Sequence, residues 1–187
     1  MKHLGTQRLE TRRLILRRFE MRDLEPMYEN CWRHKSVTQW TSYATMDCLE
    51  DVCNNAEMFT EKWLSYDNPK RYSWAIEEKA TGQVIGRMFG MDLDDSIFQV
   101  DLAYELGPDW WNRGLMTEAV AVTLSFFLRE VGLNRVFAYH AAENPASGRV
   151  MQKCGMVYEG TLRQAGKCNH GIIDVVCYSM LASDFIK

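Results

Sequence analysis

Apolar and polar residues alternate with different periods along the chain, and the changes of period predict a mixture of strands and helices. Stretches rich in β-branched and aromatic residues predict strands, and turn-forming sequences such as 80–82 and 94–95 separate them. A turn rich in Gly, Asn and Lys, at 166–171, joins the last two strands. The expected strands lie at residues 14–16, 71–77, 84–93, 97–106, 135–141, 156–163 and 172–180.

Apolar residues that recur every three or four positions identify a long central helix over residues 115–131, which Gly132 ends. The capping-box sequence Asp47-Cys48-Leu49-Glu50 predicts a helix from there to about residue 64. Two shorter helices are expected at 22–32, where Pro26 must lie in the first turn, and at 147–154. The order of elements indicates an α/β fold, with a mixed sheet and helices on its faces.

Composition narrows the class of protein. The 187-residue chain has no repeat, low-complexity tract or linker, so we expect a single domain over residues 1–187. Hydrophobic residues make up 47% and charged residues 25%, as in soluble globular proteins. We find neither a signal peptide nor an apolar run near the roughly 20 residues of a membrane span, and therefore expect a cytoplasmic protein that binds no membrane. A net charge of −3 argues against a nucleic-acid binder but suits a cationic amine substrate.

The six cysteines are scattered without a C-x-x-C pair, which indicates reduced thiols. Cys168-Asn169-His170 has the composition of a metal-binding fragment, but no second pair of ligands stands at zinc spacing. We expect these residues to form a turn, and we expect no metal site.

The segment before the long helix has the features of a phosphate-binding loop. The strand ends at Leu106, Gly107-Pro108 turns the chain, and Asn112-Arg113-Gly114 opens the helix. A helix start offers unpaired N–H groups and the positive end of the dipole, and a glycine lets a diphosphate approach the backbone. An ordinary strand-loop-helix connection fits the same residues. Neither G-x-x-x-x-G-K-[ST] nor G-x-G-x-x-G occurs, which argues against ATP or NAD chemistry.

From Leu106, the sequence L-G-P-D-W-W-N-R-G-L-M-T-E-A resembles the acyl-CoA loop of the GNAT acetyltransferases, [QR]-x-x-G-x-[GA]. Within this family the loop looks most similar to that of the RimJ/RimL-type acetyltransferases, which act on the N-termini of ribosomal proteins. Their loop commonly begins with Trp, and Trp111 stands at that position here. The resemblance spans nearly the whole chain. Its further segments are Glu10-Thr-Arg-Arg-Leu-Ile-Leu-Arg17, Gly132-Leu-Asn-Arg-Val136, Glu143-Asn-Pro-Ala-Ser147, Lys153-Cys-Gly-Met156 and Tyr158-Glu-Gly-Thr-Leu-Arg163.

The resemblance implies a mostly antiparallel mixed sheet, splayed into a V that receives acetyl-CoA. Backbone groups at 104–106 would bond the pantetheine arm, residues 113–117 would wrap the pyrophosphate, and Asn144 would bond the pantetheine from the next strand end. Met116 departs from the usual Gly or Ala, which would narrow the site but leave its N–H donor. The cofactor-binding residues implied in this way are Tyr104, Glu105, Leu106, Arg113, Gly114, Leu115, Met116, Thr117, Asn144 and Ser147.

Amide formation from a thioester needs a base that removes a proton from the attacking amine. A strand period of two places Asp101 and Glu105 on one face of residues 97–106. Asp101 matches the acidic residue of the family's E-I-G-Y stretch, and Glu105 is a second candidate. A carboxylate held in an ion pair at the sheet surface explains Asp101 equally well. Tyr139 and His140 are further candidates on a neighbouring strand.

The leaving thiolate needs a proton donor. Many GNAT enzymes place a Tyr seven residues after the Asn of this motif, where this chain has Met151. The RimJ/RimL-type resemblance implies Ser147 in its place. An N-cap role for Ser147 in the helix 147–154 fits the sequence equally well.

Three functions remain open from the sequence. The first is acetyl transfer from acetyl-CoA to a protein N-terminal α-amine, the second is transfer to a small amine such as an amino acid, polyamine or aminoglycoside, and the third is a non-catalytic acyl-CoA-binding module. The sequence favours the first, and exposed aromatics make a homodimer a further expectation. Five aromatics of the N-terminal half are core or line the acceptor site, with the core as the default: Trp32, Trp40, Tyr43, Trp63 and Trp74.

Overall fold

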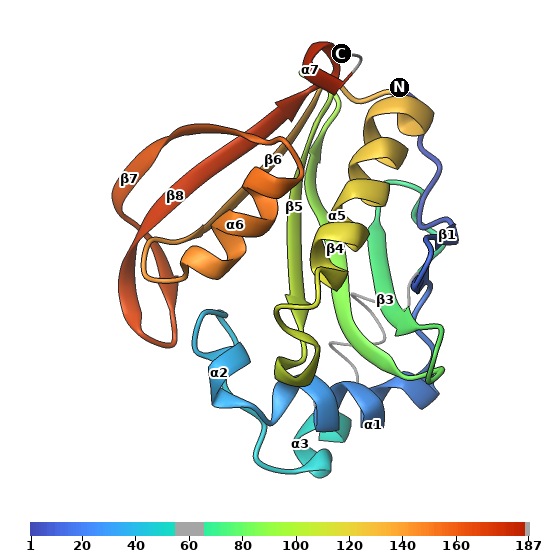
Figure 1. Ribbon diagram of the computed structural model, residues 1–187, viewed down its shortest axis with the longest axis vertical. Helices are drawn as coiled ribbons and strands as arrows, with labels where there is room; N and C mark the ends of the chain where they lie inside the picture. Colours follow the sequence, from blue (N-terminus) through green and yellow to red (C-terminus); the bar gives the residue numbers. More distant parts are fainter. Residues whose placement is uncertain (55–65, 186–187) are drawn as a thin grey trace.

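The computed structural model describes residues 1–54 and 66–185 of the chain. Eight strands form one sheet in the order β1-β2-β3-β4-β5-β6-β8-β7 (Figure 1). Neighbouring strands are antiparallel except β5 and β6, which are parallel. This confirms the expected mixed, mostly antiparallel sheet. The strands are β1 (Leu9–Glu10), β2 (Leu14–Arg17), β3 (Tyr72–Glu78), β4 (Val84–Asp94), β5 (Gln99–Leu106), β6 (Arg135–Ala141), β7 (Val157–Cys168) and β8 (Gly171–Leu181).

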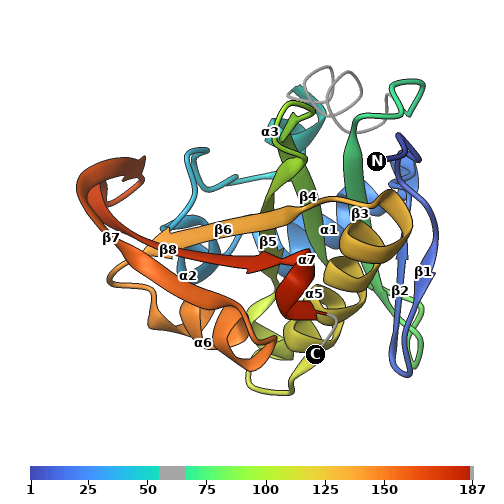
Figure 2. The ribbon, with the colours of Figure 1, turned by 90° about the horizontal axis from the view of Figure 1, so that it is seen from above.

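Helices cover both faces of the sheet (Figure 2), because successive residues of the central strands are apolar and therefore present buried side chains on each face in turn. On β3, Trp74 and Ile76 pack in the cluster that includes α5, while Ala75 packs in the cluster of α1 and η2. The helical segments are η1 (Met21–Asp23), α1 (Leu24–Met27), η2 (Tyr28–Trp32), α2 (Lys35–Thr38), α3 (Leu49–Asn54), η3 (Pro108–Trp110), α5 (Leu115–Ser125), η4 (Phe126–Val131), α6 (Pro145–Lys153) and α7 (Ala182–Phe185).

The long helix matches its prediction in extent and in the residue that ends it. α5 begins at Leu115 and continues as the π-helical segment η4 to Val131. Gly132 then takes the left-handed conformation, with φ of 78°, which glycine adopts without strain. Pro26 lies in the first turn of α1, as expected.

Several boundaries differ from the predictions. β1, α2 and α7 span only two to four residues each, too few to show a period in the sequence. The helix starts one residue later than the expected capping box 47–50 implies, since α3 begins at Leu49. The Asp51 carboxylate, and not that of Glu50, accepts the N–H groups of Asp47 and Cys48. The expected continuation of this helix to residue 64 lies outside the described residues, apart from α3 itself. In residues 1–54 and 66–185, no helix is long and apolar enough to cross a membrane.

The sheet opens between β5 and β6. These strands pair only at Gln99↔Arg135, Val100↔Val136 and Asp101↔Phe137, and both then continue without pairing to each other. Figure 1 shows β6, β8 and β7 leaning away from β5 on this side, with α6 against them. This divergence is the V that the resemblance implies.

Candidate active site

The divergence of β5 and β6 creates a cleft of 1480 Å³. All six residues of β5 from Asp101 to Leu106 line it, whichever face of the sheet their side chains occupy. The open edge of the strand therefore faces the cleft, with the main-chain groups that β6 would otherwise pair. An unpaired strand edge is a hydrogen-bonding surface for an extended ligand that carries amides.

The loop after β5 presents main-chain donors at one end of this cleft. Asn112 and Gly114 both have left-handed backbone, with φ of 58° and 73°. The first intrahelical bond of α5 runs from the Glu118 N–H to the Gly114 carbonyl, so the N–H groups of residues 115–117 precede the helical ladder. These donors, with the positive end of the helix dipole, make an anion site.

Arg113, which the resemblance places at the pyrophosphate, is held in an ion pair within the protein. Its guanidinium is 2.9 Å from the carboxylate of the buried Glu78, which also accepts the Trp110 indole N–H at 3.1 Å. The pair pins the loop and offsets the charge of Arg113. Two cations that sequence reasoning missed, Arg149 and Lys153 of α6, line the cleft instead.

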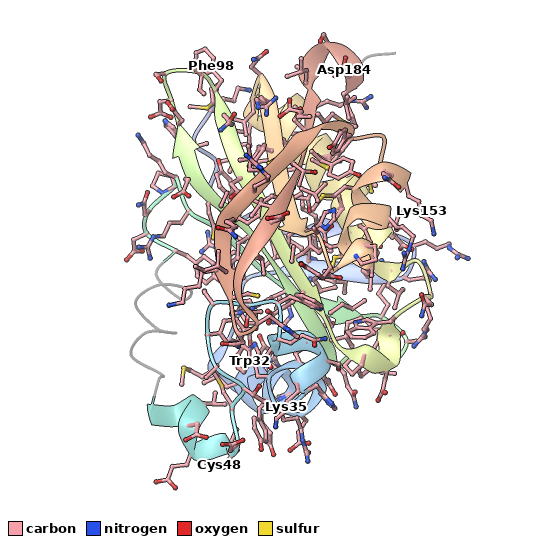
Figure 3. All side chains as sticks on the ribbon, turned by 90° about the vertical axis from the view of Figure 1, so that its left-hand side faces the viewer. Trp32, Lys35, Cys48, Phe98, Lys153 and Asp184 are labelled. Carbon is pink, nitrogen blue, oxygen red and sulfur yellow. The ribbon has the colours of Figure 1, made fainter. Side chains whose placement is uncertain are left out.

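Helix packing places those two cations near the anion site at the start of α5. The Cys154 thiol, directly after α6, donates to the Thr117 carbonyl in the first turn of α5 at 3.4 Å. Lys153, the residue before Cys154, projects outward from α6 (Figure 3). Arg149 precedes Lys153 by four residues in α6, so both side chains lie on the same side of the helix. This spacing is the signal by which sequence reasoning could have found the pair.

Ser147 lies inside α6 and is not its N-cap. The helix begins at Pro145 with Asn144 in the capping position, two residues before the expected start, because proline is favoured in a first turn. The Ser147 hydroxyl donates to the Tyr104 phenol oxygen at 3.1 Å, and the Tyr104 hydroxyl donates to the Ser147 carbonyl at 2.9 Å. Burial raises the pKa of Tyr104, so the phenol stays protonated. Two hydroxyl groups thus meet across the cleft between β5 and α6.

Asp101 stands at the point where β5 and β6 separate. Burial raises the pKa of its carboxyl to about 7, and the negative charge of Asp92 adds to the shift. Asp92 reaches this face because β4 is irregular between Met91 and Asp94, where Asp92 takes a left-handed φ of 49°. A carboxylate that titrates near neutral pH can accept and release a proton under physiological conditions.

Glu105 shares the face of Asp101, as predicted, but its oxygens are already bound. The Arg87 guanidinium lies 2.6 Å away, the Trp32 indole N–H donates at 2.8 Å, and the Tyr43 hydroxyl donates to the other oxygen. Arg87 is 3% exposed and stacks over the rings of Trp32, Tyr43 and Phe89. This geometry favours a positioning role for Glu105, which ties the N-terminal half of the chain to β5.

The other residues singled out in the sequence either line the cleft or have a structural role. The Tyr139 side chain is exposed on the cleft, and burial of its hydroxyl and the charge of Asp101 raise its pKa. His140 is buried, bonds the Ala141 carbonyl at 2.7 Å and packs against Gly148, so it has a structural role. Trp74 is core, whereas Trp40 and Tyr43 line the cleft; Trp63 lies outside the described residues. The turn expected at 166–171 is shorter in the structure, because β7 runs on to Cys168 and only Asn169 and His170 form the turn. No group of three metal-ligating side chains occurs among the described residues.

Comparison with known proteins identifies the class of enzyme. The acetyltransferase (GNAT) domain family matches residues 13–157. The chain belongs to the GNAT acetyltransferases. It is 29% identical over 173 residues to the uncharacterized N-acetyltransferase YoaA of Bacillus subtilis (strain 168), covering 92% of this chain and 96% of YoaA.

Solved structures show the same fold. A mutant of the SpeG spermidine N-acetyltransferase from Vibrio cholerae is 18% identical, with a TM-score of 0.74 over 95% of this chain and 98% of that chain. The ribosomal-protein-S5-alanine acetyltransferase from Vibrio fischeri is 17% identical, with a TM-score of 0.73 over 95% and 98%.

As a GNAT acetyltransferase, the enzyme uses acetyl-CoA as its acyl donor, and its residues fit that molecule. The open edge of β5 matches the amides of the pantetheine arm, and the N–H groups of residues 115–117 match the diphosphate. Met116 packs in the hydrophobic core, is 7% exposed and also lines the cleft, and its N–H is one of these three donors.

The Ser147–Tyr104 pair gives a first prediction. If the Ser147 hydroxyl, positioned by Tyr104, stabilises the leaving thiolate, Ser147→Ala should lower kcat about 10- to 150-fold, the effect of one hydrogen bond to a charged group, and should lower kcat more than acetyl-CoA affinity. Stopped-flow thiol release and calorimetric binding measure the two quantities. Tyr104→Phe keeps the ring and should also lower kcat. An unchanged kcat in Ser147→Ala would remove this hydroxyl from the chemistry.

The network around Glu105 gives a second prediction. Glu105→Gln leaves the buried Arg87 without its counter-charge, which should lower the free energy of unfolding by about 3–5 kcal/mol. Urea unfolding measures this. Glu10→Gln, which removes an exposed partner of Lys79, is the matched control and should change stability little. Equal effects in the two variants would contradict a structural role for Glu105.

Proposed function

We infer that this GNAT enzyme is of the RimJ/RimL type and acetylates the α-amino group of a protein N-terminus. The observation that carries the proposal is the Asp101 carboxyl in the cleft, whose pKa is raised to about 7 by burial and by Asp92. An α-amino group has a pKa of about 8, whereas a lysine side-chain amine has a pKa of about 10.4. Proton transfer to Asp101 is therefore nearly balanced for an α-amine and far less favourable for an alkyl amine.

The residues act in a definite order. The Asp101 carboxylate accepts a proton from the bound ammonium group, which leaves a neutral amine free to attack the thioester carbonyl carbon. Main-chain N–H groups on the open edge of β5 near Leu106 polarise that carbonyl oxygen. As the carbon–sulfur bond breaks, the Ser147 hydroxyl turns from the Tyr104 oxygen and donates to the thiolate, while the Tyr104 hydroxyl keeps its bond to the Ser147 carbonyl and positions the serine. The second proton of the amine ends on the thiol.

The acceptor class rests on this chemistry and not on the fold. The two solved structures of the same fold carry names with different acceptors, spermidine in one and a ribosomal protein in the other. Asp92 and Asp101 also suit a small cationic amine, which is the second candidate acceptor.

Free-thiol release from acetyl-CoA tests the proposal. Peptides that begin with Ser, Ala or Met are compared with a panel of amino acids, polyamines and aminoglycosides at equal concentration. We expect turnover with the peptides, and mass spectrometry should place the acetyl group on the α-amine. Turnover with small amines alone would favour the second acceptor class, and acetyl-CoA binding without turnover on either set would indicate a non-catalytic module.

A further inference from the structure

The tip of the β7–β8 hairpin is fastened to the loop that follows α2. The Asn169 N–H donates to the Thr41 carbonyl at 3.0 Å. The Asn169 side-chain amide donates to the Thr38 carbonyl at 2.9 Å and to the Tyr43 carbonyl at 2.7 Å. One residue of the hairpin thus satisfies three main-chain acceptors, one at the end of α2 and two in the loop after it, all more than 120 residues away in the sequence.

The neighbouring residue of the tip makes a second connection. The His170 ring stacks on the Trp40 ring, with centroids 4.7 Å apart and planes inclined by 13°. Its Nε2 lies 3.0 Å from the Gln39 side-chain oxygen, and the Gln39 amide nitrogen donates to the Ser36 carbonyl, which fixes which end of the amide faces the histidine. We refer to Gln39, Trp40, Asn169 and His170 together as the bridge.

The bridge joins two walls of the cleft that holds Asp101. Residues 39–43 line this cleft from the N-terminal half, and residues 165–167 line it from β7. Figure 1 shows the loop after α2 lying against the tip of the β7–β8 hairpin. Tyr43, at the end of the bridged loop, also bonds Glu105 on the face of Asp101. An acceptor that reaches Asp101 along these walls must therefore pass beside the bridge.

The strength of the bridge suits a filter that opens. Asn169 and His170 are exposed, so each of their hydrogen bonds competes with water and contributes modestly to the closed arrangement. The backbone on both sides belongs to anchored elements: Tyr43 bonds Glu105, and β7 is paired to β8 up to Cys168↔Gly171. Separating the walls breaks the bridge and leaves the sheet paired.

We propose that the bridge determines acceptor specificity by limiting the width of the group next to the reactive amine. Acceptors with a small first side chain fit beneath the closed bridge, whereas bulky ones react only when the contacts of Asn169 and Trp40 are broken. The inference rests on the proposed function only in that the cleft at Asp101 receives the acceptor amine.

Bridge variants test this by their selectivity. Wild type, Asn169→Ala and Trp40→Ala are compared on peptides that begin with Ala and with Phe, and on a narrow and a bulky primary amine. Asn169→Ala should raise the ratio of kcat/KM for bulky over narrow acceptors about tenfold, the effect of losing two neutral hydrogen bonds. The KM for acetyl-CoA should not change. Trp40→Phe keeps a stacking ring and should restore the wild-type ratio, and Ile172→Ala, exposed on the same hairpin, should match wild type.

The two acceptor series separate this inference from the proposed function. Turnover of amines but not peptides would refute the proposed acceptor, yet the ratio within the amine series would still measure the bridge. A ratio unchanged by both Asn169→Ala and Trp40→Ala in every series that reacts would overturn the bridge as a filter. Asn169→Asp, which removes the donors with little change of shape, replaces Asn169→Ala if that variant does not fold.

A labelling experiment reads the width of the cleft without an acceptor. Cys177 lines the cleft. In a Cys48→Ser background, which removes an exposed thiol, small and bulky thiol reagents are compared at Cys177 by mass spectrometry, with desulfo-coenzyme A, which has no thiol, filling the other end. Asn169→Ala should increase the rate of the bulky reagent about tenfold relative to the small one. Equal acceleration of both reagents, or none, would contradict the proposal.

Discussion

Replacing Asp101 with Asn should lower kcat/KM for the acceptor by about 10²- to 10⁴-fold, the usual contribution of a general base. The amide keeps the size of the side chain but cannot take the proton of the amine. Binding of acetyl-CoA should be unchanged, because the proposed diphosphate site lies at the start of α5 and not at Asp101. Steady-state kinetics and calorimetry on the same preparation measure the two effects.

The role of Asp101 as base also predicts how kcat/KM depends on pH. In the wild type, kcat/KM should rise with pH through about 7, because burial and Asp92 raise the pKa of Asp101 to that value and only the carboxylate form is active. Asp92→Asn removes the neighbouring negative charge and should shift this limb to lower pH. The charged or titratable groups nearby are Asp92 from β4, Tyr139 from β6, Cys177 from β8, the Arg87–Glu105 pair, and Lys70 and Arg71, which line the same cleft.

Stability should respond in the opposite sense to activity. Since the pKa of Asp101 is higher in the folded state than its unfolded value of about 3.9, the folded protein binds more protons between these values. Its contribution to stability is complete below the unfolded pKa and declines as pH rises through about 7. Asp101→Asn should therefore be more stable, relative to wild type, at pH 8 than at pH 5 in urea unfolding.

For the kinetic prediction, a wild-type value of kcat/KM in Asp101→Asn would refute the assignment of Asp101 as the base.

Gly114→Val should abolish measurable acetyl-CoA binding, a loss of at least about 100-fold, as expected when two hydrogen bonds to a charged group are lost. Gly114 has φ of 73°, which a β-branched residue adopts only with strain, and the side chain would stand among the donors of residues 115–117. An added Cβ would meet only Arg13, at 3.7 Å, so the chain can still fold.

Gly132→Val is the matched control for that strain. Gly132 has φ of 78° at the other end of the helix, and its nearest neighbour to an added Cβ is Met1, also at 3.7 Å. Both variants should lose similar stability in thermal unfolding, whereas only Gly114→Val should lose acetyl-CoA in calorimetry. Undiminished affinity in Gly114→Val would separate this loop from the binding site.

Local signals in the sequence were sufficient for the main elements. The three-strand meander, the helix ended by Gly132 and the strand 135–141 follow from periods and turn residues, which act over a few positions. The predicted start of α6, at residue 147, was two residues late. Pro145 and Ser147 both favour positions at a helix start, and the sequence does not show which of them the packing selects.

Contacts between distant residues explain what sequence reasoning missed at the site. The period of two correctly grouped Asp101 with Glu105, but the partners of Glu105 lie 18 to 73 residues away, so its network had no local pattern. The pairing of Arg113 with Glu78, 35 residues away, likewise had no local pattern, and the role of Arg113 at the diphosphate stays a prediction. The catalytic roles of Asp101, Glu105 and Ser147 stay predictions.

The short ladder between β5 and β6 also bears on aggregation. An unpaired strand edge invites pairing with another chain, and most proteins protect such edges with charges, bulges or covering elements. Here the unpaired length of β5 lies inside the V, where a cleft and not another strand meets it. The cleft thereby keeps this edge away from other copies of the protein, and an extended acyl donor bound along it would complete the missing row of hydrogen bonds.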